Sequence, residues 1–245
     1  MAGARLVLGI QPAREAIAVH GAKLRVLVEA RPREAEQLEA VARFARDRGA
    51  EVARVDRGTL DRMADGERHQ GVIVEAPPLV LIDVEALVLQ ETHGKTPLLI
   101  ALDELTDPQN FGAIVRTAVA LGATGVIFPE DKSAPLSAAM TRASAGAVEH
   151  ARLCRVHSLP RTLEQLAEAG VVTIALDTSG DEELATISLV EPICLVVGAE
   201  GKGLRRATRR ACTRAAKLPM RGPIASLNAS VAAAIALYEV VRQRS

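Results

Sequence analysis

The spacing of apolar residues in the first 78 positions predicts a small mixed α/β unit. Leu38, Val41 and Phe44 recur at helical spacing within Pro32–Arg48, and Gly49 follows where a helix C-terminal cap is expected. Short apolar runs of the kind that form strands alternate with two shorter helical stretches. The predicted strands are Leu24–Glu29, Glu51–Val55 and Gly71–Glu75, and the shorter helices are Gly9–Ile17, entered through a turn, and Leu60–Glu67.

Beyond residue 97 the pattern becomes a regular alternation of fully apolar runs and helical periodicities. The predicted strands are Leu98–Leu102, Gly125–Phe128, Val171–Leu176, Ile193–Val197 and a short one near Lys217–Leu218. The predicted helices are Phe111–Leu121, Pro135–Ala145, Leu159–Ala169, Gly203–Ala215 and Leu227–Arg242, the last with Leu227, Val231, Ile235, Tyr238 and Val241 along one face. Strands that are apolar throughout and separated by helices are typical of a mainly parallel sheet covered on both sides.

A connection separates the two patterned regions. Pro77-Pro78 closes the first region, a short helix is predicted at Asp83–Gln90, and His93–Pro97 breaks it. We therefore expect three segments: a small domain at residues 1–78, a linker at 79–97 and a larger α/β domain at 98–245.

Composition excludes several classes of protein. No segment reaches 18 uninterrupted apolar residues and the N-terminus lacks the apolar core of a signal peptide, so we expect a cytoplasmic protein with no membrane contact. Three widely spaced cysteines are read as reduced, mostly buried thiols, and five scattered histidines lack the spacing of a metal site. With no Trp, one Tyr and three Phe, the chain has no aromatic platform for stacking bases.

The charge balance is neutral overall but locally uneven. Formal net charge is zero, yet the stretch from Gly201 to Gly222 contains no acidic residue. Its basic residues are Lys202, Arg205, Arg206, Arg209, Arg210, Arg214, Lys217 and Arg221. Such a run is often only the solvated face of a helix, and its alternative is a surface that faces phosphates.

The strand Ile193–Val197 gives way to a loop with glycines at 198, 201 and 203, which is typical of backbone that approaches a ligand closely. Glu200 lies in this loop, and Ser226 and Asn228 lie at the start of the final helix. These side chains could meet in the crevice at the strand ends, where open α/β sheets bind ligands. The loop lacks the Walker and GxGxxG patterns, so a nucleoside triphosphate or NAD is poorly supported.

A second polar stretch, Asp103 to Arg116, follows the strand that ends at Leu102. Asn110 lies near the start of the next helix, and its role there could be no more than that of an N-cap. Arg116 lies among apolar residues of that helix, where a guanidinium must reach water or find an acceptor, and a structural ion pair is one such answer.

Three stretches together resemble the motifs of the SpoU/TrmH family of S-adenosylmethionine-dependent RNA ribose methyltransferases, in the same order and at suitable intervals. They are LDELTDPQNFGAIVR at 102–116, LVVGAEGKGL at 195–204 and LPMRGPIASLNAS at 218–230. The N-terminal GIQPAREAI and HQGVIV resemble the small substrate-binding domain of the branch that methylates guanosine in bacterial 23S ribosomal RNA. Ala229 departs from the pattern, because many members have Val after the Asn.

This resemblance implies a trefoil-knotted, SPOUT-type α/β methyltransferase domain preceded by an L30e-like RNA-binding domain. It implies S-adenosylmethionine as cofactor, large-subunit ribosomal RNA as partner and a homodimer through the knot domain. Cofactor-binding positions are Gly198, Leu218 and Leu227, and the polar positions of the active site are Asn110, Arg116, Glu200, Ser226 and Asn228. The expected reaction is methyl transfer to the ribose 2′-hydroxyl of a guanosine. The alternatives are a transfer RNA, an adenosine of ribosomal RNA, or a catalytically silent RNA-binding assembly factor.

Overall fold

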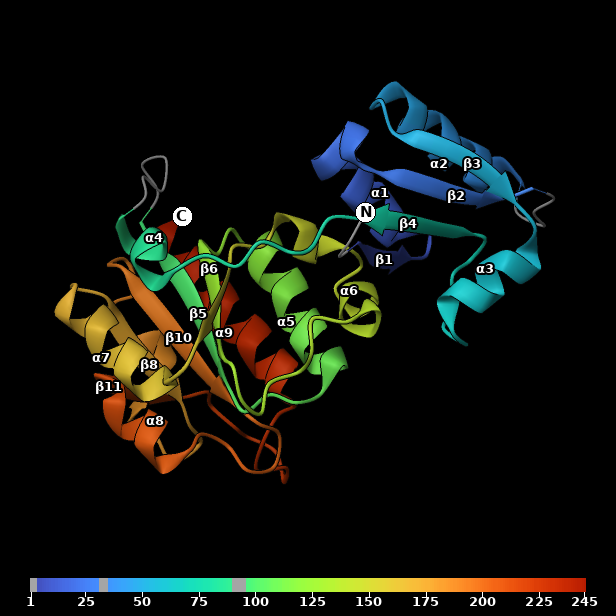
Figure 1. Ribbon diagram of the computed structural model, residues 1–245. Helices are drawn as coiled ribbons and strands as arrows, with labels where there is room; N and C mark the ends of the chain where they lie inside the picture. Colours follow the sequence, from blue (N-terminus) through green and yellow to red (C-terminus); the bar gives the residue numbers. More distant parts are fainter. Residues whose placement is uncertain (1–3, 31–34, 90–95) are drawn as a thin grey trace. The chain divides into compact units, whose positions relative to one another are not determined.

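The computed structural model describes residues 4–30, 35–89 and 96–245, which form two compact units, each with its own sheet (Figure 1). By its contacts, the first unit comprises the residues up to 79 together with Leu136–His150, and the second comprises Val80–Pro135 and Ala151–Ser245. The start of the predicted helix Pro32–Arg48, the end of the predicted helix Asp83–Gln90 and most of the predicted break at His93–Pro97 lie outside the described residues.

The first unit contains a four-stranded mixed sheet in the order β1-β4-β2-β3. Its strands are β1 (Arg5–Leu8), β2 (Arg25–Glu29), β3 (Glu51–Val55) and β4 (Val72–Ala76), and its helices include α1 (Ile10–His20), α2 (Ala35–Asp47) and α3 (Arg57–Ala64). Only β2 and β3 pair in parallel, while β4 runs antiparallel to both of its neighbours. The strand β1 was not predicted, although its apolar run before Gly9 carries the signal.

Period-two alternation places the two faces of this sheet in different cores. Val26 and Val28 of β2 pack in the cluster that contains the buried faces of α1 and α2. Leu27, between them, packs with Leu60 of α3 and Ile73 of β4. Both faces of the sheet are therefore covered by helices.

The segment Leu136–His150 belongs to the first unit by contact, although it follows β6 (Gly125–Pro129) of the second unit in the sequence. It contains α6 (Ala138–Ala143) and a short 3-10 helix, Ala147–His150. The buried carboxylate of Glu149 pairs with Arg5 at 2.5 Å and lies 2.9 Å from His20. Ion pairs thus join this segment to residues near the N-terminus.

The second unit is built on a seven-stranded sheet in the order β7-β6-β5-β10-β8-β11-β9, with parallel pairing throughout. In addition to β6, the strands are β5 (Leu98–Asp103), β7 (Leu153–Val156), β8 (Val172–Leu176), β9 (Glu182–Glu183), β10 (Ile193–Gly198) and β11 (Arg214–Lys217). The helices are α4 (Val84–Leu89), α5 (Pro108–Ala120), α7 (Leu159–Glu168), α8 (Arg206–Ala211) and α9 (Ala229–Arg244). The predicted parallel sheet is confirmed, with β7 and β9 as strands that the pattern missed.

Helices cover both faces of this sheet (Figure 1). Leu163 of α7 packs in one cluster with Ala101 of β5 and Val196 of β10. The helix α8 packs against α7, whereas α5 and α9 pack against each other and α9 contacts β10. None of the helices among the described residues is long and apolar enough to cross a membrane.

The predicted helix Gly203–Ala215 is too long, because the chain joins the sheet before that helix could end. Thr213 donates its backbone N–H to Oγ1 of Thr173 at 2.9 Å, and Thr173 returns a backbone N–H to Oγ1 of Thr213 at 3.0 Å. These bonds place β11 beside β8, so only Arg206–Ala211 remains helical.

The apolar face predicted for the last helix is turned outward in the structure. Val231, Ile235 and Tyr238 of α9 are 46%, 43% and 59% exposed. The small residues Ala233 and Ala236 are fully buried on the opposite side. This helix is therefore apolar on two sides, and one of them has no partner within the described part of the chain.

Candidate active site

The carboxyl ends of β5, β8, β10 and β11 meet at one edge of the second sheet. The register of β10 and β5 places Gly198 opposite Asp103 at this edge. Three of the loops that leave from it carry the predicted site residues: one leads from β5 to α5, one from β10 to α8, and one from β11 to α9. The strand-end crevice expected from the sequence is therefore present.

The glycine loop after β10 folds back tightly on itself. Ala199 and Gly203 form an antiparallel bridge, in which the Gly203 N–H donates to the Ala199 carbonyl at 2.8 Å. A Cβ atom on Gly198 would overlap the carbonyl group of Gly203. Only glycine fits at position 198, because the obstacle is backbone that cannot rotate away.

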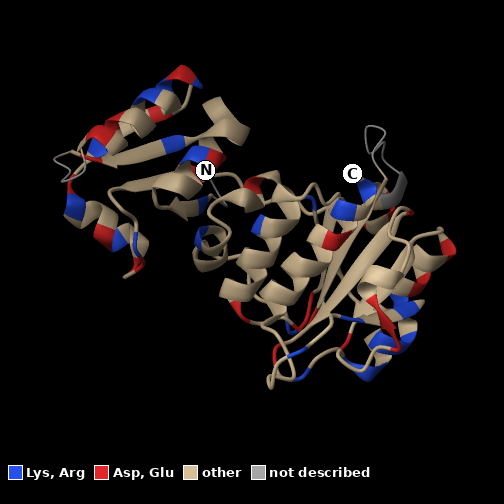
Figure 2. Ribbon diagram, turned by 180° about the vertical axis from the view of Figure 1, so that it is seen from behind, with Lys and Arg blue, Asp and Glu red and all other residues tan. Residues whose placement is uncertain are grey.

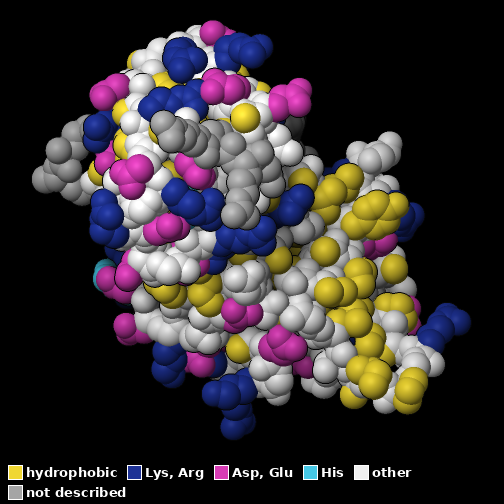
Figure 3. Space-filling model, turned by 90° about the vertical axis from the view of Figure 1, so that its right-hand side faces the viewer, with side chains coloured by type: hydrophobic (Ala, Val, Ile, Leu, Met, Phe, Trp, Pro, Cys, Tyr) yellow, Lys and Arg dark blue, Asp and Glu magenta, His cyan; other side chains and the backbone are white. Residues whose placement is uncertain are grey.

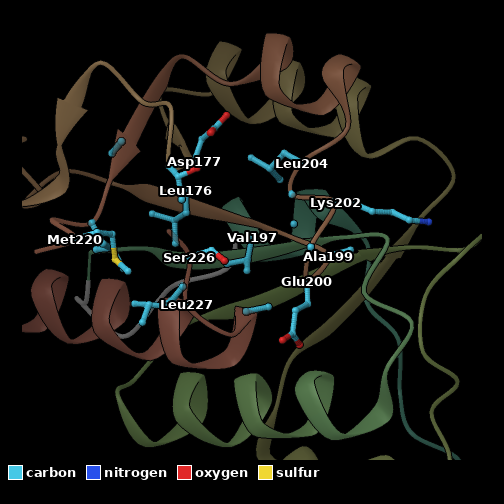
Figure 4. Close-up of a pocket in the computed structure, with 18 residues that line it drawn as sticks. Leu176, Asp177, Val197, Ala199, Glu200, Lys202, Leu204, Met220, Ser226 and Leu227 are labelled. Carbon is cyan, nitrogen blue, oxygen red and sulfur yellow. The ribbon is translucent and has the colours of Figure 1, made fainter. Parts of the chain in front are cut away.

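A cavity of about 310 Å³ lies against this loop, lined mainly by apolar residues (Figure 4). Its walls include Leu176, Val197, Leu204, Leu218, Met220 and Leu227. All three predicted cofactor positions, Gly198, Leu218 and Leu227, line it, and so do Glu200 and Ser226. The predicted residues are thus brought together from two loops more than 15 positions apart in sequence.

Asp177 also lines the cavity, and sequence reasoning did not identify it. Burial alone would raise the pKa of its carboxyl, but hydrogen bonds from Ser179 and the nearby Arg209 guanidinium outweigh burial and lower it. The backbone N–H and hydroxyl of Ser179 each donate to its Oδ1 at 2.8 Å. The only available signal was its position directly after an apolar strand.

Three of the predicted polar residues form one hydrogen-bonded cluster. Asn228 donates from Nδ2 to Oδ1 of Asn110 at 3.0 Å and to Oε2 of Glu200 at 3.0 Å. Asn110 donates from its own Nδ2 to the same Glu200 oxygen at 3.2 Å. The cluster joins all three loops of the crevice, with Asn110 only 9% exposed.

The orientation of the Asn228 amide is fixed by the helix that it caps. Its Oδ1 accepts from the backbone N–H of Ser230 at 2.9 Å and of Val231 at 3.4 Å, so its Nδ2 must point toward Glu200. Asn110, by contrast, is not an N-cap: Asp107 caps α5 and accepts from the backbone N–H of Asn110 at 3.3 Å. The capping alternative for Asn110 is therefore wrong, and its side chain is free for the cluster.

Arg116 lies apart from this cluster. It is exposed on α5, and among the described residues no hydrogen bond or ion pair joins it to Asn110 or Glu200. The structural ion pair considered for it is likewise not among the pairs that the described residues form. The structure brings Asn110, Glu200 and Asn228 together and leaves the guanidinium of Arg116 in solvent.

An ion pair on a buried carboxylate braces the crevice and was also missed from sequence. Asp103 is fully buried; its Oδ1 accepts from Nε of Arg205 at 2.8 Å and lies 2.7 Å from a terminal nitrogen of the same guanidinium. Its Oδ2 accepts from the backbone N–H of Arg205 at 2.8 Å. The end of β5 is thereby tied to the end of the glycine loop.

The basic run divides into paired and unpaired members. Arg205, Arg209 and Arg214 form ion pairs with Asp103, Asp177 and Glu182, respectively. The members without such a pair among the described residues are Lys202, Arg206, Arg210, Lys217 and Arg221. Figure 2 shows that Lys and Arg gather on the short helix α8. Part of the run therefore has a structural role, and the rest is available to a partner.

No cysteine lines the cavity beside the glycine loop, and no metal site is found among the described residues. Burial raises the pKa of Cys154 to about 11 and that of Cys212 to about 12, so both thiols stay protonated at neutral pH. Across the described ranges no three His, Cys, Asp or Glu side chains are grouped as metal ligands.

Comparisons with known proteins identify the family. Residues 97–238 match the model of the SpoU rRNA Methylase family, and residues 6–80 match the model of RNA 2′-O ribose methyltransferase substrate binding. An uncharacterized tRNA/rRNA methyltransferase of Mycolicibacterium gilvum is 43% identical over 210 residues, which cover 85% of this chain and 67% of that protein.

Two solved structures resemble the whole chain. The SpoU methyltransferase AviRb from Streptomyces viridochromogenes, in complex with S-adenosylmethionine, superposes with a TM-score of 0.80 at 27% identity, covering 99% of this chain and 91% of that one. An S-adenosylmethionine-bound rRNA methyltransferase from Sinorhizobium meliloti superposes with a TM-score of 0.75 at 25% identity, covering 98% and 87%. The fold class and the cofactor expected from the sequence are confirmed. The chain belongs to the SpoU methyltransferase family and is an RNA methyltransferase.

Proposed function

We propose that this protein transfers a methyl group from S-adenosylmethionine to the ribose 2′-hydroxyl of a guanosine in 23S ribosomal RNA. The observation that carries the proposal is the Asn110–Glu200–Asn228 cluster, held at the edge of an apolar cavity at the strand ends. The ribose and guanosine assignments rest on the motif resemblance and on the match of residues 6–80 to the substrate-binding family.

The chemistry of the cavity walls fits the cofactor. Leu176, Leu218 and Leu227 offer apolar surface to an adenine ring and to the methylene groups of a methionine moiety, and Gly198 allows close approach of the backbone. The carboxylates of Asp177 and Glu200 provide negative charge for a cationic ligand. When bound, S-adenosylmethionine supplies an electrophilic methyl group on a positively charged sulfur.

The polar cluster is suited to hold a ribose beside that cavity. Oε2 of Glu200 accepts two amide hydrogen bonds, so the carboxylate is fixed while its second oxygen, Oε1, stays available to a hydroxyl. Ser226 lines the same cavity and can complete the contacts around the reacting oxygen. Holding two reactants in near-attack geometry can supply roughly 7–11 kcal/mol of the barrier.

Arg116 keeps its charge during the reaction, because a guanidinium with a pKa above about 12 rarely releases its proton. Its exposed position on α5 suits contact with an RNA phosphate by paired hydrogen bonds. If Arg116→Lys retained wild-type turnover and an unchanged pH profile, this paired contact would be excluded.

We assign RNA recognition to residues 1–78 and to the unpaired members of the basic run, with 79–97 as linker and 98–245 as the catalytic domain. Contacts to phosphate make affinity depend on salt. RNA affinity is therefore expected to fall as salt rises, and a flat response would remove this assignment.

We also propose a homodimer through the catalytic domain, located in the cytoplasm. The exposed apolar face of α9, with Val231, Ile235 and Tyr238, is the surface offered for it. Figure 3 shows hydrophobic side chains gathered on one side of the molecular surface. A second copy of this chain would remove that surface from water.

Transfer RNA is the alternative substrate, because the M. gilvum relative and others are named tRNA/rRNA methyltransferases. The deciding experiment maps ribose methylation across total RNA from cells with and without the gene. Loss of one methylated guanosine in 23S ribosomal RNA is the expected result. Loss of methylation in transfer RNA alone would show that transfer RNA is the substrate instead. If the purified protein bound no S-adenosylmethionine in calorimetry, a silent RNA-binding factor would become the better description.

A further inference from the structure

A second cavity of about 350 Å³, lined mainly by polar and charged residues, lies beside the cofactor cavity. Ala199, Glu200 and Lys202 line both cavities, so the glycine loop forms the wall between them. Figure 4 shows the Glu200 side chain pointing toward α5 and Lys202 pointing away from the cofactor cavity. The remaining walls are Glu104, Leu105, Thr106, Asp107, Asn110 and Lys132.

An ion pair between two residues of unusual backbone conformation lies at this cavity. Nζ of Lys132 donates to Oε1 of Glu104 at 2.9 Å. Both residues have positive φ, 53° for Glu104 and 54° for Lys132, in a chain with only three other such non-glycine residues among those described. Strained backbone of this kind persists where the surroundings hold it, and it is concentrated at functional sites. Two strained loops are thus pinned to each other across the cavity.

The carboxylates and the lysines of the cavity differ in how fully they are paired. Both oxygens of Asp107 accept backbone N–H groups of α5, and Oε2 of Glu200 accepts two amides. Oε1 of Glu104 is bound to Lys132 and lies 3.6 Å from Nε of Arg205. Lys202 forms no ion pair with any of the described residues, and the Lys132 side chain is 69% exposed. The carboxylates therefore already have hydrogen-bond donors, whereas the ammonium groups of Lys132 and Lys202 can bind a further anion.

We propose that Lys132 and Lys202 bind a phosphate of the RNA strand next to the nucleotide that is methylated, and that Glu104 occupies Lys132 until the RNA arrives. This inference rests on the proposed function. A hydrogen bond from Lys132 lowers the pKa of Glu104, so the carboxylate is charged and is a genuine competitor of phosphate at neutral pH. The phosphate contact would position the ribose at the Asn110–Glu200–Asn228 cluster.

The opposing explanation is that Glu104 and Lys132 form only a structural ion pair. Substituting each partner separately distinguishes the two, because a structural pair is lost equally from either side. Under the proposal, Lys132→Gln removes a phosphate contact, whereas Glu104→Gln removes the competitor. The two substitutions then change RNA affinity in opposite directions.

The experiment measures RNA binding and S-adenosylmethionine binding by the full chain, with the RNA class identified by the methylation map as probe. For Lys132→Gln we expect RNA affinity to fall about fivefold and the slope of log affinity against log salt to decrease by about 0.7 to 0.9. Lys202→Gln is expected to act in the same direction, and Glu104→Gln to raise RNA affinity. Arg161→Gln, an exposed change on α7, is the matched control and should alter neither quantity.

Each outcome decides one point. Equal losses of RNA affinity in Lys132→Gln and Glu104→Gln, or an unchanged salt slope in Lys132→Gln, would overturn the phosphate site while leaving the methyltransferase assignment intact. Failure of the wild-type chain to bind S-adenosylmethionine or to methylate the RNA would instead refute the proposed function itself. Circular dichroism spectra that match wild type show that each variant is folded.

Discussion

Arg205 makes two hydrogen bonds and a further ion-pair contact with the fully buried carboxylate of Asp103, across 102 positions of sequence. The pair joins the end of β5 to the glycine loop that lines both cavities. Removing the partner of a buried carboxylate strongly destabilises the folded state. Arg205→Ala is therefore expected to lower the free energy of unfolding by about 3 kcal/mol. Urea denaturation measures this change in the free energy of unfolding, with Arg161→Ala as the exposed control. An equal change in Arg205→Ala and in the control would show that water replaces the guanidinium at no cost.

Gly198→Ala should abolish S-adenosylmethionine binding. Its new Cβ atom would overlap backbone atoms of Gly203 and Leu204, so the loop must open. Gly222→Ala is the matched control, since it lies in the loop before α9 and its new methyl group would have no neighbouring atom within 4 Å. Calorimetric titration of cofactor into both variants makes the test. Wild-type affinity in Gly198→Ala would mean that the loop has more freedom than its bridge indicates.

Asn228 caps α9 and also donates to Asn110 and Glu200, and two substitutions separate these roles. Asn228→Ala removes the N-cap of α9, at a cost of about 1 kcal/mol, together with the bonds to Asn110 and Glu200. Asn228→Asp keeps a capping oxygen but replaces the donor to Glu200 with a second carboxylate. We expect Asn228→Asp to retain most of the thermal stability while single-turnover methyl transfer falls at least about tenfold. Equal activity in Asn228→Asp and wild type would exclude a catalytic role for the cluster.

Charged residues introduced on the outward face of α9 test the dimer. Ile235→Glu and Tyr238→Glu, at positions 43% and 59% exposed, should leave the folded chain monomeric in light scattering. Val80→Glu, at another exposed apolar position, should leave the mass unchanged. A wild-type chain that is already monomeric at micromolar concentration would contradict the proposed assembly.

Cys154 should react with a thiol reagent only in strongly alkaline solution or after unfolding. Burial raises its pKa to about 11, so almost no thiolate is present in the folded protein at pH 8. In the unfolded chain the thiol ionises at lower pH, so its contribution to stability is complete below about pH 8.5 and is lost as pH rises toward 11. Reaction with Ellman's reagent at pH 8, with and without urea, checks this. Rapid labelling of the native protein would show that the thiol is not sequestered.

The sequence was informative where a local pattern reflects a local requirement. Gly198 follows an apolar strand and is needed for the close backbone approach, and Glu200 and Asn228 could be selected because motifs mark them. That Asn110 meets Asn228 could be expected only from a family fold, because the two residues are 118 positions apart.

Other features could not be predicted because they depend on partners distant in sequence. The helical pattern of Gly203–Ala215 continues through Thr213, and only pairing with Thr173 of β8 converts its end to a strand. Likewise, nothing local distinguishes Asp103, which becomes a buried brace, from Asp107, which is exposed in the acidic loop that follows. The apolar stripe of α9 was visible, but its orientation toward solvent follows from the packing of alanines on the other side.

The glycine loop supplies one wall to each of two cavities, and Glu200 on that wall is hydrogen-bonded to both other loops of the crevice. Any ligand that orders this wall from one side changes the free energy needed to occupy the other side. By thermodynamic linkage the effect is reciprocal, so each occupant must alter the affinity of the protein for the other by the same factor. The size of that factor is then a property of six residues of backbone, Gly198 to Gly203, rather than of either binding surface alone.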